Sequence, residues 1–246
     1  MPRRSRLIKT GVCVFVVATL LFFPARVAYQ WFAPPDLIAG GLSGSVWSGS
    51  ALEVNAGGVY LQNLKWKFRV ADLFLGRLGY AVEARPAAGF LQADVSFGVS
   101  GELAVRNLNA SLALESLQSA LQLPGMRGSI SVRFGELRIS GGVPVVAEGT
   151  ITVTNFVMPQ IHRETLGTFH AEFLTRDEGV AASVEDTDAI VDLAGGLTVS
   201  TDGSYAFLAN VAVKPETPPD MRENMQLFLG SPDARGRHEL RLEGHL

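Results

Sequence analysis

Four histidines and one acidic cluster are the side chains in this sequence that could support metal binding or acid–base catalysis. The histidines are His162, His170, His238 and His245. None of them has a second histidine at the spacing of an HxxxH or HExxH motif, which places two ligands on one face of a helix. The acidic cluster consists of Glu185, Asp186, Asp188 and Asp192. It lacks the Asp-x-Asp-x-Asp-Gly order of a calcium loop, so a polar turn between strands accounts for it.

No other motif in the sequence supplies a nucleophile, a phosphate-binding loop or a redox group. The Gly-x-Ser-x-Gly elbow of hydrolases and the glycine-rich phosphate loop are both missing. Cys13 is the single cysteine and lies in the apolar N-terminal stretch, which excludes disulfides and thiolate chemistry from the rest of the chain. We therefore predict a protein that is not an enzyme and that binds no cofactor or metal ion.

Alternation of apolar and polar residues predicts that most of the chain beyond residue 40 forms β-strands. In the stretches 64–70, 91–99 and 130–134, every second residue is apolar, and the residues between them are polar, charged or glycine. Such a period means one buried and one wet face, as in antiparallel sheet. We predict a mainly β fold: a single N-terminal transmembrane helix followed by a long antiparallel sheet, strongly curved or barrel-like, with one or two short helices.

The alternation breaks in a few places, which predict irregularities and short helices. Apolar residues are odd-numbered before residues 106–107 and even-numbered after them, so a bulge or turn is expected there, and a similar slip is expected at Gly135. The leucines of 114–121 recur at helical spacing and predict one short helix. The stretch 218–230 predicts a second, with an apolar face formed by Met221, Met225 and Phe228. Both helices are expected to plug or cap the sheet, and docking of a partner is the alternative for the second.

The first 31 residues predict a membrane anchor. Residues 1–10 carry four basic side chains and no acidic one, and residues 11–25 carry no charge. A basic stretch before an apolar one is typical of membrane targeting, with the basic side kept in the cytoplasm. A cleaved signal peptide is the alternative, but Arg26 stands where a cleavage site needs a small residue. The expected membrane-interface residues are Arg3, Arg4, Arg6, Lys9, Arg26, Tyr29 and Trp31.

These features predict four segments along the chain. They are a cytoplasmic basic tail at 1–10, a transmembrane anchor at 11–31, a linker at 32–40 and a periplasmic antiparallel β domain at 41–246. All 24 acidic residues follow position 35, whereas five of the 21 basic residues precede it, leaving 16 basic against 24 acidic residues and a net charge of −8. An acidic domain without a basic cluster argues against nucleic-acid binding.

The most distinctive local sequence is a glycine- and serine-rich stretch at 41–51 around a single tryptophan. Gly41, Gly44 and Gly49 flank Trp47. Glycines beside a large ring allow two backbones to approach closely, with the ring filling the space. We predict a strand or hairpin in which Trp47 closes the end of the sheet nearest the membrane. A binding role for the ring is the alternative.

The same stretch, placed soon after one N-terminal anchor, resembles the type II secretion system protein N family. Trp66 in the following strand and three C-terminal motifs in a fixed order are similar to the same family. The motifs are a Gly-x-Tyr strand, a Leu-Gly helix end and a Gly-Arg hairpin. In this sequence they contain Gly203, Tyr205, Leu229, Gly230, Gly236 and Arg237. The glycine–tryptophan start also resembles the broader group of AsmA-like membrane-anchored β-sheet proteins.

The resemblance implies an accessory component of the type II secretion system in the bacterial inner membrane, single-pass, with a cytoplasmic N-terminus and a periplasmic C-terminal domain. Such a component assists export of folded periplasmic proteins across the outer membrane through contacts with other secretion-system proteins. The alternative is an AsmA-like protein that binds or transfers lipid in an apolar groove, for which a lipid or lipoprotein partner is expected. We expect the sheet to curl on itself and to fill most of the space that it encloses. The identity of the partner and the oligomeric state stay open at this point.

Overall fold

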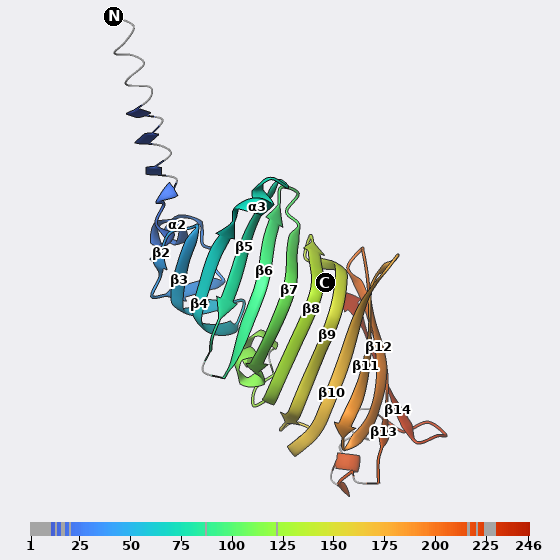
Figure 1. Cartoon of the computed structure of the whole chain (residues 1–246). Coiled ribbons are helices and arrows are strands. Elements are labelled where there is room, and N and C mark those ends of the chain that lie inside the picture. The colour runs from blue at the N-terminus through green and yellow to red at the C-terminus, as the bar shows by residue number, and fades with distance from the viewer. Residues whose placement is uncertain are drawn as a thin grey trace, which may run out of the picture.

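The computed structural model describes residues 11–246 with the exception of 13, 16, 17, 20, 87, 122, 216, 220 and 224–229. Within these residues, fourteen strands form one antiparallel sheet and the helices are short, which confirms the predicted mainly β fold (Figure 1). The strands are β1 (Leu37–Gly40), β2 (Ser43–Gly44), β3 (Ser48–Ala56), β4 (Val59–Arg69), β5 (Arg77–Ala84), β6 (Gly89–Gly98), β7 (Leu103–Ala113), β8 (Arg127–Ser140), β9 (Val143–Met158), β10 (His162–Arg176), β11 (Gly179–Ala189), β12 (Val191–Ser200), β13 (Ser204–Val213) and β14 (Arg237–His245). The helices are α2 (Ala25–Phe32), α3 (Val70–Leu73), the 3-10 helix η1 (Leu114–Leu117) and α4 (Gln118–Leu121).

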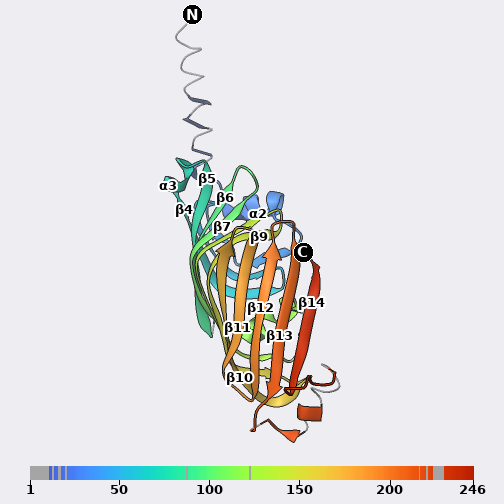
Figure 2. The ribbon, with the colours of Figure 1, turned by 90° about the vertical axis from the view of Figure 1, so that its right-hand side faces the viewer.

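The sheet is a meander in which each strand from β3 to β14 pairs with the next one along the chain. β1 pairs with the other side of β3, and the two-residue β2 pairs with the start of β3. β1 and β14 are the two edges of the described sheet, and they do not pair with each other. The barrel-like form predicted from the sequence is therefore wrong, because the sheet is strongly curved but open (Figure 2).

Local structure at β1 makes this edge a poor partner for a further strand. A closed barrel needs its first and last strands to share backbone hydrogen bonds. β1 has only four residues, and its outward backbone groups are already bonded by one side chain. The hydroxyl of Tyr29 donates to the carbonyl of Leu37 (3.0 Å) and accepts from the N–H of Ala39 (3.1 Å). This edge thus offers β14 no free row of donors and acceptors.

The two faces of the sheet carry different side chains, as the alternation predicted. On one face, apolar residues stand opposite each other across neighbouring strands, as Trp66 and Val82 do in β4 and β5, and Leu197 and Phe207 do in β12 and β13. On the other face the pairs are polar or charged, as with Lys65 and Glu83. Burial of the apolar face stabilises the sheet by about 25 cal/mol for each Å² removed from water.

The apolar face is concave, and its C-terminal half packs against itself. Phe134 and Ala147, from β8 and β9, form one buried cluster with Val180 and Val199, from β11 and β12. The ring centroids of Phe134 and Phe173 lie 5.3 Å apart. Strands that are two or three positions apart in the sheet therefore touch across the concave face, which confirms the expected curling for this half.

The N-terminal half of the concave face is more open. Leu78 and Phe97 stand opposite each other in β5 and β6, and both remain about half exposed. The space that the sheet encloses is thus only partly filled. The sequence had led us to expect that most of this space would be filled. The difference arises because no strand lies across the concave face from β4–β6, where the eight-residue α2 is the nearby cover.

Two bulges lie where the alternation changed phase. In β7, the register against β6 shifts between the partners of Gln92 and Asp94, and Asn107 in this bulge has φ of 51°. Asparagine tolerates this left-handed conformation better than most residues. The second bulge lies at Gly135, where the register of β8 against β9 shifts. Both predicted irregularities are confirmed, and each returns the apolar residues to the concave face.

Short helical segments lie where helical spacing was found. η1 and α4 follow β7, and Leu114 at their start is buried. In the second segment, residues 221–223 are helical, and Met221 is buried in a cluster with Leu166, Val191 and Val211. Met225 and Phe228, predicted for the same apolar face, lie outside the described residues.

In the part of the chain that is described, no helix is both long enough and apolar enough to cross a membrane. Four of the predicted membrane-interface residues lie outside the described residues, namely Arg3, Arg4, Arg6 and Lys9.

Candidate functional site

The side chains that could do chemistry do not gather into one site. Among the described residues, no group of three or more histidine, cysteine, aspartate and glutamate side chains is arranged to hold a metal ion. His170 Nδ1 shares a hydrogen bond with Thr152 Oγ1 (3.0 Å) on a neighbouring strand. In the acidic cluster, Asp186 forms an ion pair with Lys214. These contacts tie strands and turns together and leave interaction surfaces as the candidates for function.

The glycine–tryptophan stretch forms β2 and the start of β3, and a ring lies over its glycines. A Cβ atom built at Gly49 would fall 2.4 Å from Cζ2 of Trp66, so the Trp66 ring lies directly over this glycine. Trp66 Nε1 donates to the carbonyl of Ser45 (3.1 Å), which fixes the ring. The predicted ring at this place was that of Trp47. Trp47 instead packs edge-on against Phe68, with centroids 4.8 Å apart.

The first two glycines of this stretch are required by the backbone. Gly41 and Gly44 have φ of 65° and 86°, in the left-handed region that favours glycine. They let the chain turn from β1 into β2 and back against β3. The pattern quoted for the family resemblance therefore has a local structural reason.

Residues of α2 that were predicted for the membrane interface also contact the sheet. Arg26 Nε donates to the carbonyl of Leu42 (2.7 Å). The hydroxyl of Tyr29 caps β1, as described above. Trp31 is exposed, and its ring lies 6.0 Å from that of Phe23 and 6.3 Å from that of Phe32. α2 thus has one side bonded to the sheet and another that presents aromatic rings.

The C-terminal motif residues lie around the ends of β13 and β14. Gly203 has φ of 91° in the turn between β12 and β13. The ring of Tyr205 covers Gly244, where a Cβ atom would fall 2.6 Å from the Tyr205 hydroxyl oxygen. Gly236 has φ of 77° and precedes β14. Leu229 lies outside the described residues. Gly203 and Gly236 thus shape the turns that precede β13 and β14, and Tyr205 packs over the end of β14.

Asp233 organises the turn that leads into β14. Its Oδ1 accepts hydrogen bonds from the backbone N–H groups of Arg235 and Arg237 (both 2.8 Å), and its Oδ2 lies 3.2 Å from Arg237 Nη2. The bond from the Arg237 backbone is the largest cause that lowers the pKa of Asp233. His238, the next residue, is buried, and its Nδ1 shares a hydrogen bond with the carbonyl of Gly230 (2.8 Å).

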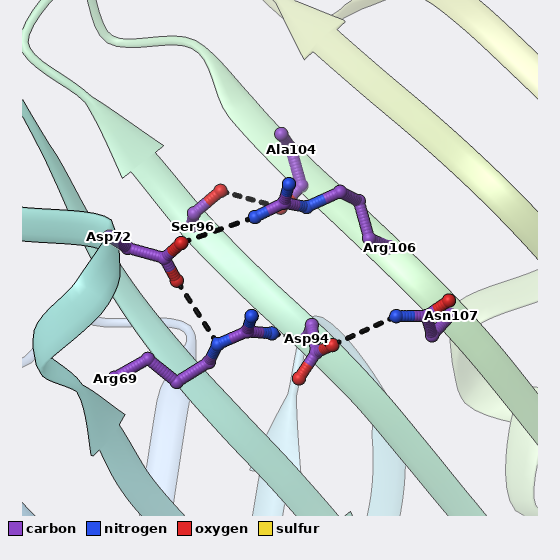
Figure 3. A network of polar contacts seen from close by, with 7 residues as sticks. All are labelled: Arg69, Asp72, Asp94, Ser96, Ala104, Arg106 and Asn107. Carbon is purple, nitrogen blue, oxygen red and sulfur yellow. Dashed lines mark hydrogen bonds and ion pairs between the residues drawn. The ribbon is translucent and has the colours of Figure 1, made fainter. Parts of the chain in front are cut away.

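A network of charged side chains holds α3 against the polar face of the sheet (Figure 3). Asp72 is only 3 % exposed and forms ion pairs with Arg69 Nε (3.2 Å) and Arg106 Nη2 (3.3 Å). Arg69 Nη1 lies 2.5 Å from Asp94 Oδ2, and Asn107 Nδ2 donates to the same oxygen (3.0 Å). The carboxylate of Asp72 is thus removed from water but paired on both oxygens, as a buried charge requires.

Gly79 and the bulge in β7 are the sequence features that permit this network. A Cβ atom at Gly79 would fall 1.9 Å from Asp72 Oδ2, so a glycine is needed beneath the carboxylate. The bulge brings Asn107 to Asp94. Burial by itself raises the pKa of Asp94, but hydrogen bonds from Asn107 and Arg69 outweigh it and hold that pKa below its usual value.

The network directs the apolar side of α3 into solvent. With Asp72 turned inward, the neighbouring residues point outward, and Phe74 is 88 % exposed. The β6–β7 turn lies beside α3, because Arg77 pairs with Gly98, and Val99 in that turn is 99 % exposed. Figure 1 shows α3 at the same end of the sheet as α2. We define the apolar corner as the exposed residues Val70, Leu73, Phe74, Leu75 and Val99.

The concave face is hollowed at both ends of the sheet. A cavity of about 330 Å³ lies between β9 and β14 and has a wholly apolar lining. Its walls include Phe156, Leu166, Phe169, Val191, Phe207 and Leu240. A second cavity of about 400 Å³ lies between α2 and β4–β6, where Ala28, Trp66, Tyr80 and Phe97 line it. Both volumes fall in the range of small-ligand pockets, about 300–1,000 Å³.

A second polar network joins the end of β13 to β11 and to the start of β12. Lys214 Nζ lies 2.5 Å from Asp186 Oδ2 and donates to the carbonyl of Ala189 (3.1 Å). Asp186 Oδ1 accepts from the N–H of Leu193 (2.7 Å). Burial alone raises the pKa of Asp186, but the bonds from Lys214 and Leu193 lower it more strongly. Further along the segment that follows β13, Met221 lines the apolar cavity between β9 and β14.

Sequence reasoning missed the two polar networks and the apolar corner, and it offered an apolar groove only as the alternative to a filled sheet. The ion pairs join residues 34 positions apart in the case of Asp72 and Arg106, and no local pattern records such a pairing. One signal was available for the apolar corner. Residues 73–75 are three consecutive apolar residues between two stretches of clean alternation, and such a run in a turn marks an exposed apolar surface.

Comparison with known proteins gives one consistent result. The model of the family described as "Type II secretion system (T2SS), protein N" matches residues 35–241. The chain is 25 % identical over 241 residues to the type II secretion system protein N of Vibrio cholerae serotype O1, with 95 % of each chain covered. It is 24 % identical over 257 residues to the protein of the same name from Aeromonas hydrophila, with 95 % of this chain and 96 % of the relative covered. No solved structure matches the chain significantly.

Proposed function

Because the chain belongs to the type II secretion system protein N family, we propose that it is an accessory inner-membrane component that assists export of folded periplasmic proteins through protein–protein contacts. We assign residues 1–10 to the cytoplasm, 11–31 to a transmembrane anchor whose last part, in α2, lies at the membrane surface against the sheet, 32–40 to a linker that also contributes β1, and 41–246 to the periplasm. The basic residues before an uncharged stretch at 11–25 support this topology. Other secretion-system proteins are the proposed partners.

The observation that carries the contact role is the free edge at β14. The opposite edge strand is short and capped by Tyr29, whereas β14 has nine residues and ends the sheet. Figure 2 shows β14 with no strand on its outer side. An exposed edge of this length is a template onto which an extended segment of another protein can add as a further strand.

The hydrogen-bond pattern identifies which residues of β14 face the free side. Leu246 N–H donates to the carbonyl of Gly203 (2.9 Å), so the even-numbered residues of β14 direct their backbone groups toward β13. The odd-numbered residues direct theirs outward. Those of Arg237 are bonded to Asp233. The outward groups that have no partner among the described residues belong to Glu239, Arg241, Glu243 and His245.

Arg241→Pro is expected to block this edge without disrupting the bonds to β13. Proline lacks the N–H group, and at position 241 that group points outward, where edge strands tolerate proline. We expect co-purification of secretion-system proteins with the full-length protein from its own membrane to fall about tenfold or more, roughly the loss of 1.4 kcal/mol of binding free energy. Secretion of a folded exported protein should fall with it.

Arg241→Ala is the matched control, because it removes the same side chain and keeps the outward N–H. It should co-purify partners and support secretion as the unchanged protein does. Equal secretion and equal co-purification by the proline variant would refute docking at β14. Circular dichroism of both variants reports whether the sheet is retained.

Lipid binding is a second candidate function, and the apolar cavity between β9 and β14 favours it. The cavity has no polar lining residue that would fix a polar ligand, so an acyl chain is the chemistry that fits it. Native mass spectrometry of the same purified full-length protein tests this function. Stoichiometric phospholipid that Phe169→Trp displaces, by filling the cavity, would support it, whereas secretion-system proteins without bound lipid would favour the contact role alone.

A further inference from the structure

The apolar corner is a rigid projection and not a loose loop. Asp72 sits over Gly79 and is bonded to two arginines, one from β4 and one from β7. These contacts fix α3 from its inner side, so residues 73–75 cannot turn inward without breaking a buried ion pair. The corner therefore keeps Phe74 and its neighbours in water, where they contribute nothing to the folded core. Exposed apolar groups held in this way mark a surface that contacts another apolar phase.

Other exposed apolar groups lie near the apolar corner, on the side of the sheet where α2 and α3 are found. α2 lies at that end in Figures 1 and 2 and presents Trp31 and Phe32, both more than two-thirds exposed. Phe22, just before α2, is 77 % exposed. Phe22 itself belongs to the uncharged stretch 11–25. Two separate elements, one N-terminal and one between β4 and β5, thus present apolar side chains at the end where the proposed anchor joins the sheet.

We propose that the apolar corner inserts into the interfacial layer of the same bilayer that holds the anchor. The folded domain then contacts the membrane at two places, α2 and the corner, and stands on the membrane by that end of its sheet. This inference rests on the proposed inner-membrane placement and adds a membrane contact made by the folded domain itself. Apolar side chains of interfacial segments lie about 5–10 Å deep, at the boundary of headgroups and acyl chains.

The composition of the corner favours lipid over a protein partner. Its five residues are aliphatic or phenylalanine, and none can donate or accept a side-chain hydrogen bond. Protein interfaces place such residues in a core surrounded by a polar rim with direct hydrogen bonds. Here the polar side chains that hold α3 from beneath are engaged in the ion pairs of Asp72 with Arg69 and Arg106. A bilayer offers apolar contact without hydrogen-bond partners. The polar residues next to the corner can remain among the lipid headgroups while the apolar side chains insert.

Site-specific fluorescence on the full-length chain tests the insertion. Cys13 is the single cysteine, so Cys13→Ser gives a background in which Phe74→Cys carries the only label. The protein, labelled with an environment-sensitive nitrobenzoxadiazole dye, is reconstituted into vesicles of phosphatidylethanolamine and phosphatidylglycerol. A fraction of the lipid carries a nitroxide quencher on its acyl chain. We expect the label at position 74 to lose about half or more of its fluorescence to this lipid, because its depth brings it within reach of the quencher.

Leu121→Cys in the same background is the matched control. Leu121 ends α4, at the opposite end of β7, and is about half exposed. Its label should respond to a water-soluble quencher and not to the lipid-borne one. Val99→Cys provides a second position in the corner, where full exposure means that the label disturbs no packing.

Labels at 74 and 99 that respond only to the water-soluble quencher would overturn the proposal, even when the protein floats with the vesicles. Flotation reports the anchor separately, so failure of the inner-membrane placement and failure of the corner give different results. Because the vesicles contain no secretion-system protein, a corner reserved for a protein partner would stay in water in this experiment.

Discussion

Phe134→Ala is expected to lower the free energy of unfolding by about 3–5 kcal/mol, the usual cost of removing a buried phenylalanine ring. Phe134 is 6 % exposed and belongs to the cluster in which β8 and β9 meet β11 and β12 across the concave face. Its ring also lies 5.3 Å from that of Phe173. In the described part of the chain this cluster is built from strand residues alone, so only other strands can collapse into the cavity that the ring would leave. Urea denaturation of the purified full-length protein, followed by tryptophan fluorescence, measures the change.

Phe90→Ala is the control for this prediction, because it removes the same ring from a half-buried place. Phe90 is 39 % exposed and stands opposite Ser111 on the polar side of β6. Its loss should cost about 1 kcal/mol or less, since much of the ring is already in water. Equal losses for the two variants would contradict the view that packing across the concave face holds the curled sheet together.

Gly49→Val is expected to cost about 2–4 kcal/mol and to release the N-terminal end of the sheet. A Cβ atom at this position falls 2.4 Å from the Trp66 ring and 2.5 Å from the carbonyl oxygen of Ser43. The ring must therefore leave its place, and the backbone of β2 must also shift, which weakens its pairing with β3. Its hydrogen bond to Ser45 is then lost. Urea denaturation measures the loss of stability. Limited proteolysis, followed at residues 33–48, reports whether the N-terminal strands are released.

Gly196→Val tests whether any added side chain on a strand glycine has this effect. Gly196 lies in β12, its nearest neighbouring atom is 3.7 Å from a built Cβ, and its φ is not in the left-handed region. Valine favours strands, so this variant should be neutral or slightly stabilising. A Gly49→Val protein as stable and as protease-resistant as Gly196→Val would mean that the Trp66 ring has room to move.

Some family motif residues have conformations that the neighbouring sequence determines, whereas others depend on a strand that is distant in the sequence. Gly41, Gly44 and Gly203 have left-handed φ, and a short sequence with glycine at a turn predicts such a conformation. The ring over Gly49 is different. Trp47 is the nearer ring in sequence, and Trp66 is the ring that lies there, because the pairing of β3 with β4 sets Gly49 opposite Trp66. Register is a property of two strands, and the sequence of one strand does not contain it.

The free edge and the apolar corner also depend on distant contacts. That β14 is a free edge follows from the sheet remaining open, and the other edge, β1, is capped by a hydroxyl from α2. That residues 73–75 point outward follows from the pairing of Asp72 with Arg106, a residue of another strand. The alternation pattern is the same in edge and central strands, so it does not show which strand is an edge. The apolar run 73–75 interrupts the pattern, but the run alone does not show which way its side chains point.

The sequence by itself determined the elements of this protein: strands of period two, two bulges at the phase changes, short helices, and motifs similar to those of the secretion-system family. These properties arise from neighbouring residues, because side-chain direction along a strand alternates whatever the strand pairs with. The tertiary structure decided that the sheet is open, how far its concave face is filled, and which edge and which apolar side chains remain available. Those properties depend on contacts between residues far apart in the chain, which only the curvature of the whole sheet brings together.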